Sequence, residues 1–264
     1  MTRKLQTVRP TDSATLASQF MLWASVRHLL VIDGTKLVGL LSDRDLLRVK
    51  EAFAKDVTVA DIMTREPMVI DLDATLDDAA AKMAGGRIGC LPVVQGGALV
   101  GILTSTDILA ERGRLIHKGR AAGGTVPHVG SIMRRNVAFV TRDTTLLAAI
   151  EKLLLADVRH LPVLDEELRV VGMLSDRDAR EAMGDIRDAL YRRDRSALET
   201  TRVEDVMTHA PTTISADASV LDLADELIDE RIGAIVVVDD DDRMVGIVSY
   251  VDVLAFAFGR LQTA

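Results

Sequence analysis

Four short segments of this chain place a serine or threonine three residues before an aspartate. They read GLLSDRD, GILTSTD, GMLSDRD and GIVSYVD, and their final residues are Asp45, Asp107, Asp178 and Asp252. Two aliphatic residues precede each hydroxyl, so we expect a strand to end and a helix to begin there. A helix N-terminus attracts anions such as phosphate through its unpaired N–H groups and its dipole. The aspartate one turn later could accept both hydroxyls of a ribose.

The same spacing also has a purely structural interpretation. A serine or threonine three residues before an acidic residue is common at helix starts, where the two side chains satisfy free backbone N–H groups. A single segment therefore leaves nucleotide binding and helix capping equally open. Four copies in register establish a repeat more firmly than they establish that any pocket is filled.

The four segments belong to a longer unit that recurs along the chain. An apolar strand and a polar or glycine turn precede each segment, and a second strand leads into its glycine. The four apolar strands are 28–32, 90–94, 160–164 and 234–238. Upstream lies an amphipathic helix, as at 75–83, which follows a short apolar strand. The order of elements is therefore β-α-β-β-α, and we expect helix caps at Asp73, Thr144 and Ser219.

The copies also resemble one another in pairs. Copies one and three share Val-Arg-His-Leu and Ser-Asp-Arg-Asp, whereas copies two and four share Arg-Ile-Gly. A two-repeat module that was later duplicated explains this pattern, so we expect one module at 1–122 and another at 128–264. Copies two to four begin with Ile-Met or Val-Met, a lead-in that copy one lacks. The predicted repeats are 1–55, 56–122, 128–198 and 199–264, with a linker at 119–127 and an extended helix at 179–198.

The unit order and the glycine-to-aspartate segment resemble the CBS domain, which is named after cystathionine β-synthase. The resemblance covers nearly the whole chain. It implies an α+β fold of four CBS repeats, in which pairs of repeats pack through their sheets into two pseudo-twofold Bateman modules, arranged as a flat disk. Four repeats in one chain are similar in layout to the regulatory γ subunit of AMP-activated protein kinase. One chain could complete the disk, or two chains could form a homodimer with two mixed disks.

The resemblance also implies where a ligand would bind. In this family each pocket combines the Ser/Thr–Asp segment of one repeat with the apolar strand of its partner repeat. Carried over, site 1 is Ser42, Arg44 and Asp45 with Ile88, Gly89 and Cys90; site 2 is Thr104 and Asp107 with Arg27 and His28; site 3 is Ser175, Arg177 and Asp178 with Ile232, Gly233 and Ala234; site 4 is Ser249 and Asp252 with Arg159 and His160. The implied ligands are AMP, ADP or ATP, with S-adenosylmethionine less favoured and no metal required.

The positive residues in these sites have simpler interpretations as well. Arg44 and Arg177 could lie on a solvated helix turn and pair with a neighbouring aspartate. His28 and His160 could pack at a strand edge without touching a ligand. The sequence leaves these alternatives open beside phosphate binding.

Composition restricts the other functions of the chain. The net charge of −8 argues against general nucleic-acid binding, because a phosphate backbone selects a basic surface. A basic stretch at 112–120 lacks interleaved aromatic residues, and we interpret it as a charged connector. The uncharged run 88–106 contains Pro92 and a Gln-Gly-Gly turn, so we expect two strands there and no membrane span.

The cellular compartment follows from two further observations. Cys90 is the only cysteine, so no intrachain disulfide can form and a reducing compartment is expected. The N-terminal sequence MTRKLQTVRPTDS lacks the apolar core of a signal peptide. We therefore expect a cytoplasmic protein.

The acidic turn 239–242 is expected to be solvated and not to bind a cation.

These observations lead to a functional hypothesis. No Gly-rich phosphate loop, zinc-ligand spacing or Ser-His-Asp set remains once the repeats are accounted for, so we expect no enzymatic activity. We expect a regulatory protein that senses an adenine nucleotide and acts in trans on an unidentified protein target. The alternative is a ligand-independent scaffold whose repeats bring other proteins together.

Overall fold

The computed structural model describes residues 1–47, 57–111, 126–182 and 196–257. Most of the predicted linker, the basic stretch 112–120 and most of the predicted helix 179–198 lie outside these residues. Within the described ranges, no helix is both long and apolar enough to cross a membrane. The uncharged run 88–106 contains two paired antiparallel strands, as the sequence predicts.

The first two repeats form module one, and each repeat builds a small sheet. Copy one contributes β1 (Thr7–Val8), α1 (Ala14–Ala24), β2 (His28–Asp33), β3 (Lys36–Ser42) and α2 (Asp43–Leu47). Copy two contributes α3 (Val59–Ile62), β4 (Thr64–Arg65), β5 (Ile70–Asp71), α4 (Leu76–Gly86), β6 (Cys90–Gln95) and β7 (Ala98–Thr104), and residues 105–111 are helical. In both sheets a short strand runs parallel to the first strand of an antiparallel hairpin.

Copies three and four form module two on the same plan. Copy three contributes η2 (Val129–Ser131), α6 (Leu146–Leu155), β8 (His160–Leu164), β9 (Val170–Ser175) and α7 (Asp176–Ala182). Copy four contributes α9 (Ser196–Thr200), η3 (Val203–Asp205), β10 (Thr208–His209), β11 (Thr213–Ser215), α10 (Val220–Asp229), β12 (Ala234–Val238), β13 (Met244–Ser249) and α11 (Tyr250–Ala257). All four predicted hairpins form, because runs of aliphatic residues bounded by turn residues favour strands.

The start of each repeat joins the sheet of its partner repeat. β4, at the start of copy two, pairs with β3 of copy one, and β10 of copy four pairs with β9 of copy three. The reciprocal contacts are single bridges, from Thr2 to Ile102 and from Arg134 to Ile247. This exchange ties two repeats into one module.

A methionine at the start of each repeat packs against a glycine of the partner repeat, the first residue of its glycine-to-aspartate segment. The four pairs are Met1 with Gly101, Met63 with Gly39, Met133 with Gly246 and Met207 with Gly172. A Cβ on the glycine would lie only 2.3 to 2.8 Å from the methionine sulfur, so glycine leaves the room that the methionine fills. Met1 therefore supplies the lead-in that copy one was expected to lack. The sequence pattern missed it because that pattern was an Ile-Met or Val-Met pair.

Two of the three predicted helix caps are wrong by one or two residues. α4 is capped by Thr75 and α6 by Thr145, and each hydroxyl accepts the N–H three residues on. Asp73 and Thr144 belong to the turn that precedes each cap and form hydrogen bonds within it. The predicted cap at Ser219 is confirmed.

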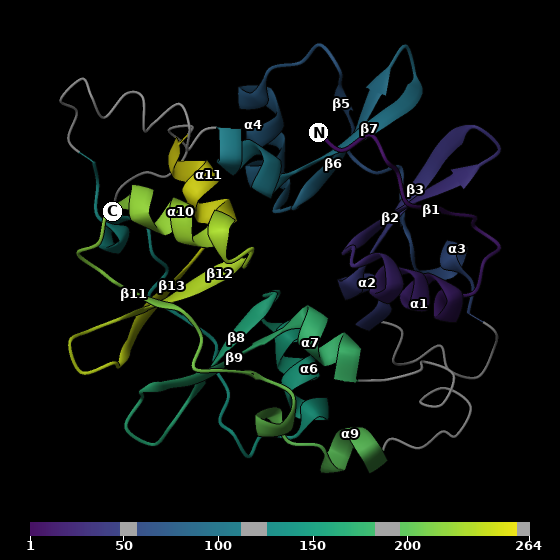
Figure 1. Ribbon diagram of the computed structural model, residues 1–264. Helices are drawn as coiled ribbons and strands as arrows, with labels where there is room; N and C mark the ends of the chain where they lie inside the picture. Colours follow the sequence, from purple (N-terminus) through teal and green to yellow (C-terminus); the bar gives the residue numbers. More distant parts are fainter. Residues whose placement is uncertain (48–56, 112–125, 183–195, 258–264) are drawn as a thin grey trace.

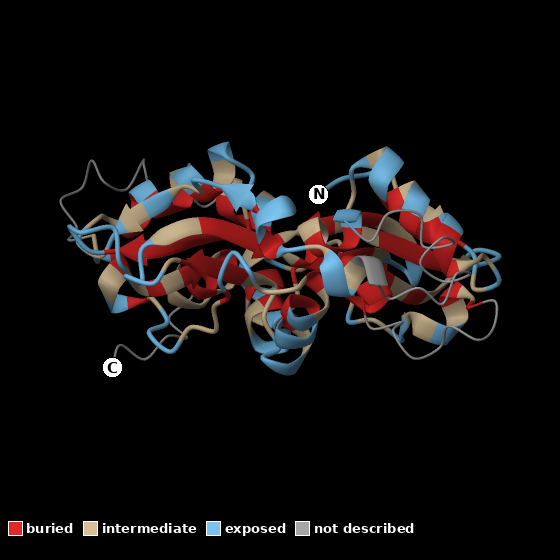
Figure 2. Cartoon of the chain, turned by 90° about the horizontal axis from the view of Figure 1, so that it is seen from below, coloured by how far each residue is buried: buried red, intermediate tan, exposed pale blue. Residues whose placement is uncertain are grey.

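The two modules meet side by side, with copy one against copy three and copy two against copy four (Figure 1). α2 packs on α7 in the first contact, and α4 packs on α11 in the second. The second contact is one continuous apolar core, whereas Leu47 of copy one is buried in the core of copy three. Figure 2 shows that the assembly is flat when seen edge-on. The predicted α+β disk of two paired modules is confirmed.

The contact between copies one and three also contains a buried ion pair. Arg180 Nε of α7 lies 2.5 Å from Asp43 Oδ1 of α2, and the two side chains are 2% and 4% exposed. Among the described residues, neither Asp43 oxygen nor Arg180 Nε has a hydrogen-bond partner, so charge proximity holds the pair, while Arg180 Nη1 donates to the Ser18 carbonyl at 3.5 Å. Burial raises the pKa of Asp43 to about 6, against the opposing effect of Arg180.

Candidate functional site

Arg27–His28 and Arg159–His160, the pairs predicted for sites 2 and 4, meet at the centre of the disk. Each pair follows a residue in the left-handed conformation, with φ of 52° or 51°, which ends the preceding helix. That conformation turns the chain from the helix into β2 or β8, and the histidine is the first residue of the strand. The same local turn in two repeats therefore brings two arginines and two histidines together.

Both central histidines are neutral. Each ring is partly accessible from a cavity, but the surrounding protein displaces most of its water and lowers the pKa of His28 and of His160 to about 3. Arg27 and Arg159 add electrostatic repulsion against a proton on either ring. The positive charge of the centre therefore resides on the arginines, and the neutral imidazoles can each donate or accept a hydrogen bond.

All four Ser/Thr–Asp segments adopt one geometry. One carboxylate oxygen, Oδ2, accepts the backbone N–H at 2.8–2.9 Å and the hydroxyl at 2.6–2.7 Å. The four acceptors are Asp45, Asp107, Asp178 and Asp252. Helix capping, the structural interpretation of these segments, is thus present in every copy. It commits the hydroxyl proton to the carboxylate, but it uses only one carboxylate oxygen and so does not exclude a ligand on the other.

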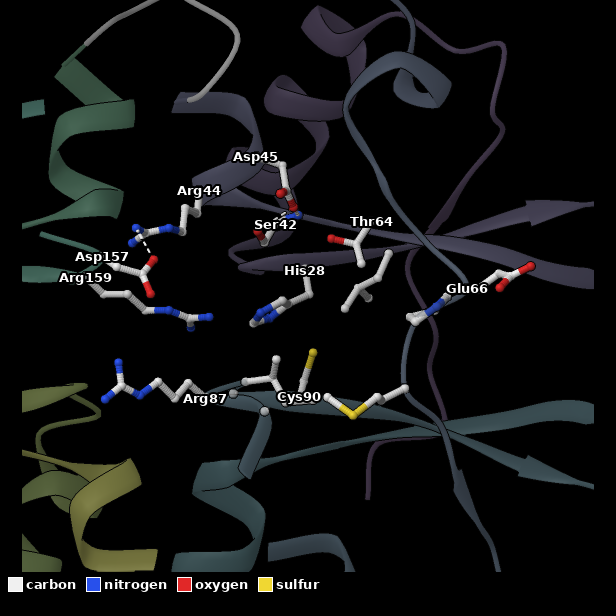
Figure 3. A pocket seen from close by; sticks show the side chains of 16 residues that line it. His28, Ser42, Arg44, Asp45, Thr64, Glu66, Arg87, Cys90, Asp157 and Arg159 are labelled. Carbon is white, nitrogen blue, oxygen red and sulfur yellow. Dashed lines mark hydrogen bonds and ion pairs between the residues drawn. The ribbon is translucent and has the colours of Figure 1, made fainter. Parts of the chain in front are cut away.

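The cavity of site 1 has a volume of about 460 Å³, within the usual range for small-molecule sites. It brings together the two predicted halves, with Ser42 and Asp45 from copy one and Cys90 from copy two (Figure 3). Ile88 of copy two also lines it. Burial raises the pKa of the Cys90 thiol to about 12, so this residue packs as an apolar wall. Site 1 is therefore a formed pocket with polar and apolar sides.

Arg44 lines the same cavity but is held at the junction of the modules. Its guanidinium donates to the carbonyl of Val158 at 2.8 Å. It also pairs with Asp157 at 2.8 Å (Figure 3). It is therefore not the solvated helix-turn residue of the simpler interpretation, and much of its hydrogen-bonding capacity is already used. Arg87 and Arg159, which the sequence did not assign to site 1, line this cavity as well.

Site 4 adjoins site 1 and is smaller, with a cavity of about 250 Å³. Its predicted residues all line this cavity, namely Ser249, Asp252, Arg159 and His160. Arg87 and Arg159 line the cavities of both sites. A residue that the sequence did not indicate, Arg134, also lines it and donates from Nε to Asp252 Oδ1 at 2.8 Å.

Sites 2 and 3 open into one cavity of about 770 Å³. The predicted residues that line it are Arg27, His28 and Thr104 from site 2 and Arg177, Ile232 and Gly233 from site 3. Asp107, Ser175 and Asp178 line none of the three cavities described, and Ala234 lines that of site 4. Arg177 also pairs with Glu181 on its own helix at 2.9 Å. The structure thus brings the predicted halves of these two sites together only in part.

Sequence reasoning missed the position directly after each lead-in methionine. Thr64 lines site 1, Thr2 lines the cavity of sites 2 and 3, and Arg134 lines site 4. The repeat contained this signal, since each of these residues follows a methionine. Tyr250 also lines the cavity of site 4 and that of sites 2 and 3. No sequence pattern indicated it, because its hydrogen bond from Arg159, at 3.1 Å, joins copy four to copy three.

Comparison with known proteins agrees with this architecture. A family model described as "CBS domain" matches residues 1–52, 59–114, 129–185 and 203–259. The crystal structure of MJ1225 from Methanocaldococcus jannaschii matches with a TM-score of 0.84. MJ1225 has been proposed as an archaeal homologue of γ-AMPK. The match covers 97% of both chains at 22% sequence identity, which shows the fold.

Curated relatives match over part of their length. MJ1225 is 30% identical over 155 residues, which are 56% of this chain and 55% of that protein. Homoserine O-acetyltransferase of Methanocorpusculum labreanum is 32% identical over 137 residues, which are 52% of this chain and 26% of the enzyme. The matched part therefore spans about half of one relative and about a quarter of the other.

Proposed function

This chain belongs to the CBS-domain family, and on that premise we propose that it is a regulatory protein that binds adenine nucleotides. Site 1 carries the proposal. Its cavity of about 460 Å³ places the cap aspartate Asp45 opposite an apolar strand and near two arginines. Among the described residues, Oδ1 of Asp45 has no hydrogen-bond partner, because the cap uses only Oδ2.

The residues of site 1 suit the three parts of an adenine nucleotide. Asp45 Oδ1 would accept the ribose hydroxyls, since a carboxylate is a strong acceptor for a vicinal diol. Ile88 and Met68 offer apolar surface for the adenine ring. Arg87 and Arg159 would face the phosphates, which need positive charge in a protein whose net charge is −8.

We propose AMP, ADP or ATP as the ligand. S-adenosylmethionine is less favoured, because its sulfonium cation would approach the same arginines. Among the described residues, no group of three or more His, Cys, Asp or Glu side chains could hold a metal ion, and the proposal requires none.

Regulation would act on a separate protein. Site 1 is lined by residues of both modules, including Arg44 from copy one and Asp157 from copy three. A ligand there can stabilise one relative orientation of the modules, and a protein partner can bind that orientation preferentially. We propose that the chain has no catalytic activity of its own and that it acts in trans in the cytoplasm. We also propose the repeat division 1–55, 56–122, 128–198 and 199–264; both modules come from one chain, so no homodimer is required.

A ligand-independent scaffold is the second candidate. The observation that favours it is the cap geometry itself, which accounts for every Ser/Thr–Asp segment without a ligand. In this alternative the repeats act only as a surface for protein assembly.

Isothermal titration calorimetry of the full chain with AMP, ADP and ATP distinguishes the two candidates. We expect wild type to bind and Asp45→Asn to weaken binding at site 1 by tenfold or more. Asp78→Asn is the matched control, because Asp78 caps α4 with the same oxygen, at 2.7 Å from the Thr75 hydroxyl, but is exposed and lines no described cavity. Absence of binding by wild type, or equal weakening by both variants, would contradict the proposed function.

A further inference from the structure

The position after the lead-in methionine is threonine in three repeats and arginine in one. Strand register aligns the four residues, since each pairs with the residue that follows the partner's repeat glycine. The pairs are Thr2 with Ile102, Thr64 with Leu40, Thr208 with Met173 and Arg134 with Ile247. Arg134 therefore lines site 4 from a register position that holds threonine in the other three repeats.

Arg134 uses the carboxylate oxygen that helix capping leaves over. Asp252 Oδ2 accepts the N–H and hydroxyl of Ser249, at 2.9 and 2.6 Å, and Arg134 Nε donates to Oδ1 at 2.8 Å. Both oxygens of Asp252 are thus engaged. In the described part of the chain, Oδ1 of Asp45, Asp107 and Asp178 has no such partner.

A ribose would have to replace an ionic hydrogen bond with neutral ones. The Asp252 side chain is 6% exposed, so water screens this pair poorly on the aspartate side, and charge-assisted bonds are stronger than neutral ones. The Arg134 side chain, which is 45% exposed, also occupies space in a cavity of about 250 Å³, compared with about 460 Å³ at site 1. Both the charge and the volume disfavour a nucleoside at site 4.

The neighbouring site 1 gives an independent reason why nucleotide would occupy only one of sites 1 and 4. Arg87 and Arg159 line the cavities of both site 1 and site 4. Two phosphate groups that shared these two cations would repel each other across a short distance. An empty site 4 leaves both arginines to the ligand of site 1.

We propose that Arg134 closes site 4 to adenine nucleotides by holding the Asp252 oxygen that a ribose would need. The inference rests on the proposed function and restricts it, because nucleotide then binds at other sites while site 4 stays shut. Arg134 acts as an internal substitute for the ligand.

Native mass spectrometry of the full chain with AMP tests this inference by counting bound nucleotides. At an AMP concentration that saturates wild type, we expect Arg134→Thr to bind one AMP more. Adding Asp252→Asn to that variant should remove the additional AMP. Arg135→Thr is the matched control, because it removes the same charge from an exposed neighbouring position and should leave the count unchanged.

The reciprocal substitution makes the test two-sided. Thr64→Arg places the same side chain at the equivalent position of site 1, and it should lower the wild-type count by one. An Arg134→Thr count equal to or below that of wild type would overturn the inference and leave the proposed function intact. Failure of wild type and Arg134→Thr alike to bind any AMP would overturn both.

Discussion

Arg44 of copy one ends 2.8 Å from Asp157 of copy three, so the start of a helix in one module is bonded to the end of a helix in the other. The same guanidinium donates to two backbone carbonyls at and just beyond the end of α6. Its equivalent in copy three, Arg177, pairs instead with Glu181 on its own helix. The reason lies in copy one, where the position equivalent to Asp157 is the uncharged Ser25. Two repeats with the same Ser-Asp-Arg-Asp motif therefore use it differently.

Arg44→Ala should lower the free energy of unfolding by about 2–4 kcal/mol, because it removes a largely buried charge that bonds both modules. Arg177→Ala is the matched control and should cost less than about 1 kcal/mol, because its ion pair is exposed. Urea unfolding followed by circular dichroism measures both. Equal losses of unfolding free energy in the two variants would show that the contact of Arg44 with copy three does not stabilise the junction between the modules.

The neutral state of His28 and His160 should make the fold sensitive to acid. Their pKa is about 3 in the folded protein and near 6.5 in the unfolded chain, so acid protonates the unfolded chain first. Their stabilising contribution is complete above pH 6.5 and is lost as pH falls toward 3. At about 1.4 kcal/mol per pKa unit, each ring contributes up to several kcal/mol to this loss.

The double variant His28→Gln and His160→Gln isolates this effect. The raised pKa of Asp43, Asp176 and Asp178 changes stability in the opposite direction, since burial destabilises these carboxylates as pH rises. These three carboxylates are present in both proteins, so their effect cancels in the comparison. We expect wild type to lose more stability than the double variant between pH 7 and pH 4, measured as the urea midpoint. If the urea midpoints of wild type and the double variant fell in parallel with pH, the central histidines would not be neutral in the folded protein.

Local features of the fold could be predicted from the sequence because they depend on residues close in the chain. β2 begins at His28 and β12 at Ala234, where the apolar runs begin. The cap of α4 was misplaced from Thr75 to Asp73, because both residues can cap and the choice depends on the turn that precedes the helix. Errors of this kind move an element boundary and leave the repeat intact.

Contacts between repeats could not be predicted in the same way. Arg44 meets Asp157 across 113 residues, and Arg134 meets Asp252 across 118. No local pattern indicates which arginine will reach which aspartate, because that depends on how the modules dock for Arg44 and on how two repeats pair within one module for Arg134. The resemblance between repeats even misleads here, since it assigns Arg44 and Arg177 one shared role that the structure does not give them.

The packing of lead-in methionines should be measurable as a coupling between repeats. Gly172→Ala would place a Cβ 2.3 Å from the Met207 sulfur, so we expect a loss of about 1–3 kcal/mol in the free energy of unfolding. Met207→Ala makes room and should recover part of that loss in the double variant. A double-mutant cycle by urea unfolding gives the coupling energy. Additive effects would mean that the methionine moves aside and that the glycine is not needed for this contact.

Cys90 offers a direct chemical test of the site 1 wall. Burial raises the pKa of its thiol to about 12, so at pH 8 only about one molecule in 10⁴ carries the reactive thiolate, compared with roughly a quarter for an ordinary cysteine. Reaction with Ellman's reagent should therefore be at least a hundredfold slower in the native protein than in the same protein unfolded in urea. Because Cys90 is the only cysteine, the colour reports this one position without interference. A native rate within tenfold of the unfolded rate would mean that the strand at site 1 opens readily to solvent, and that β6 does not close the site 1 cavity.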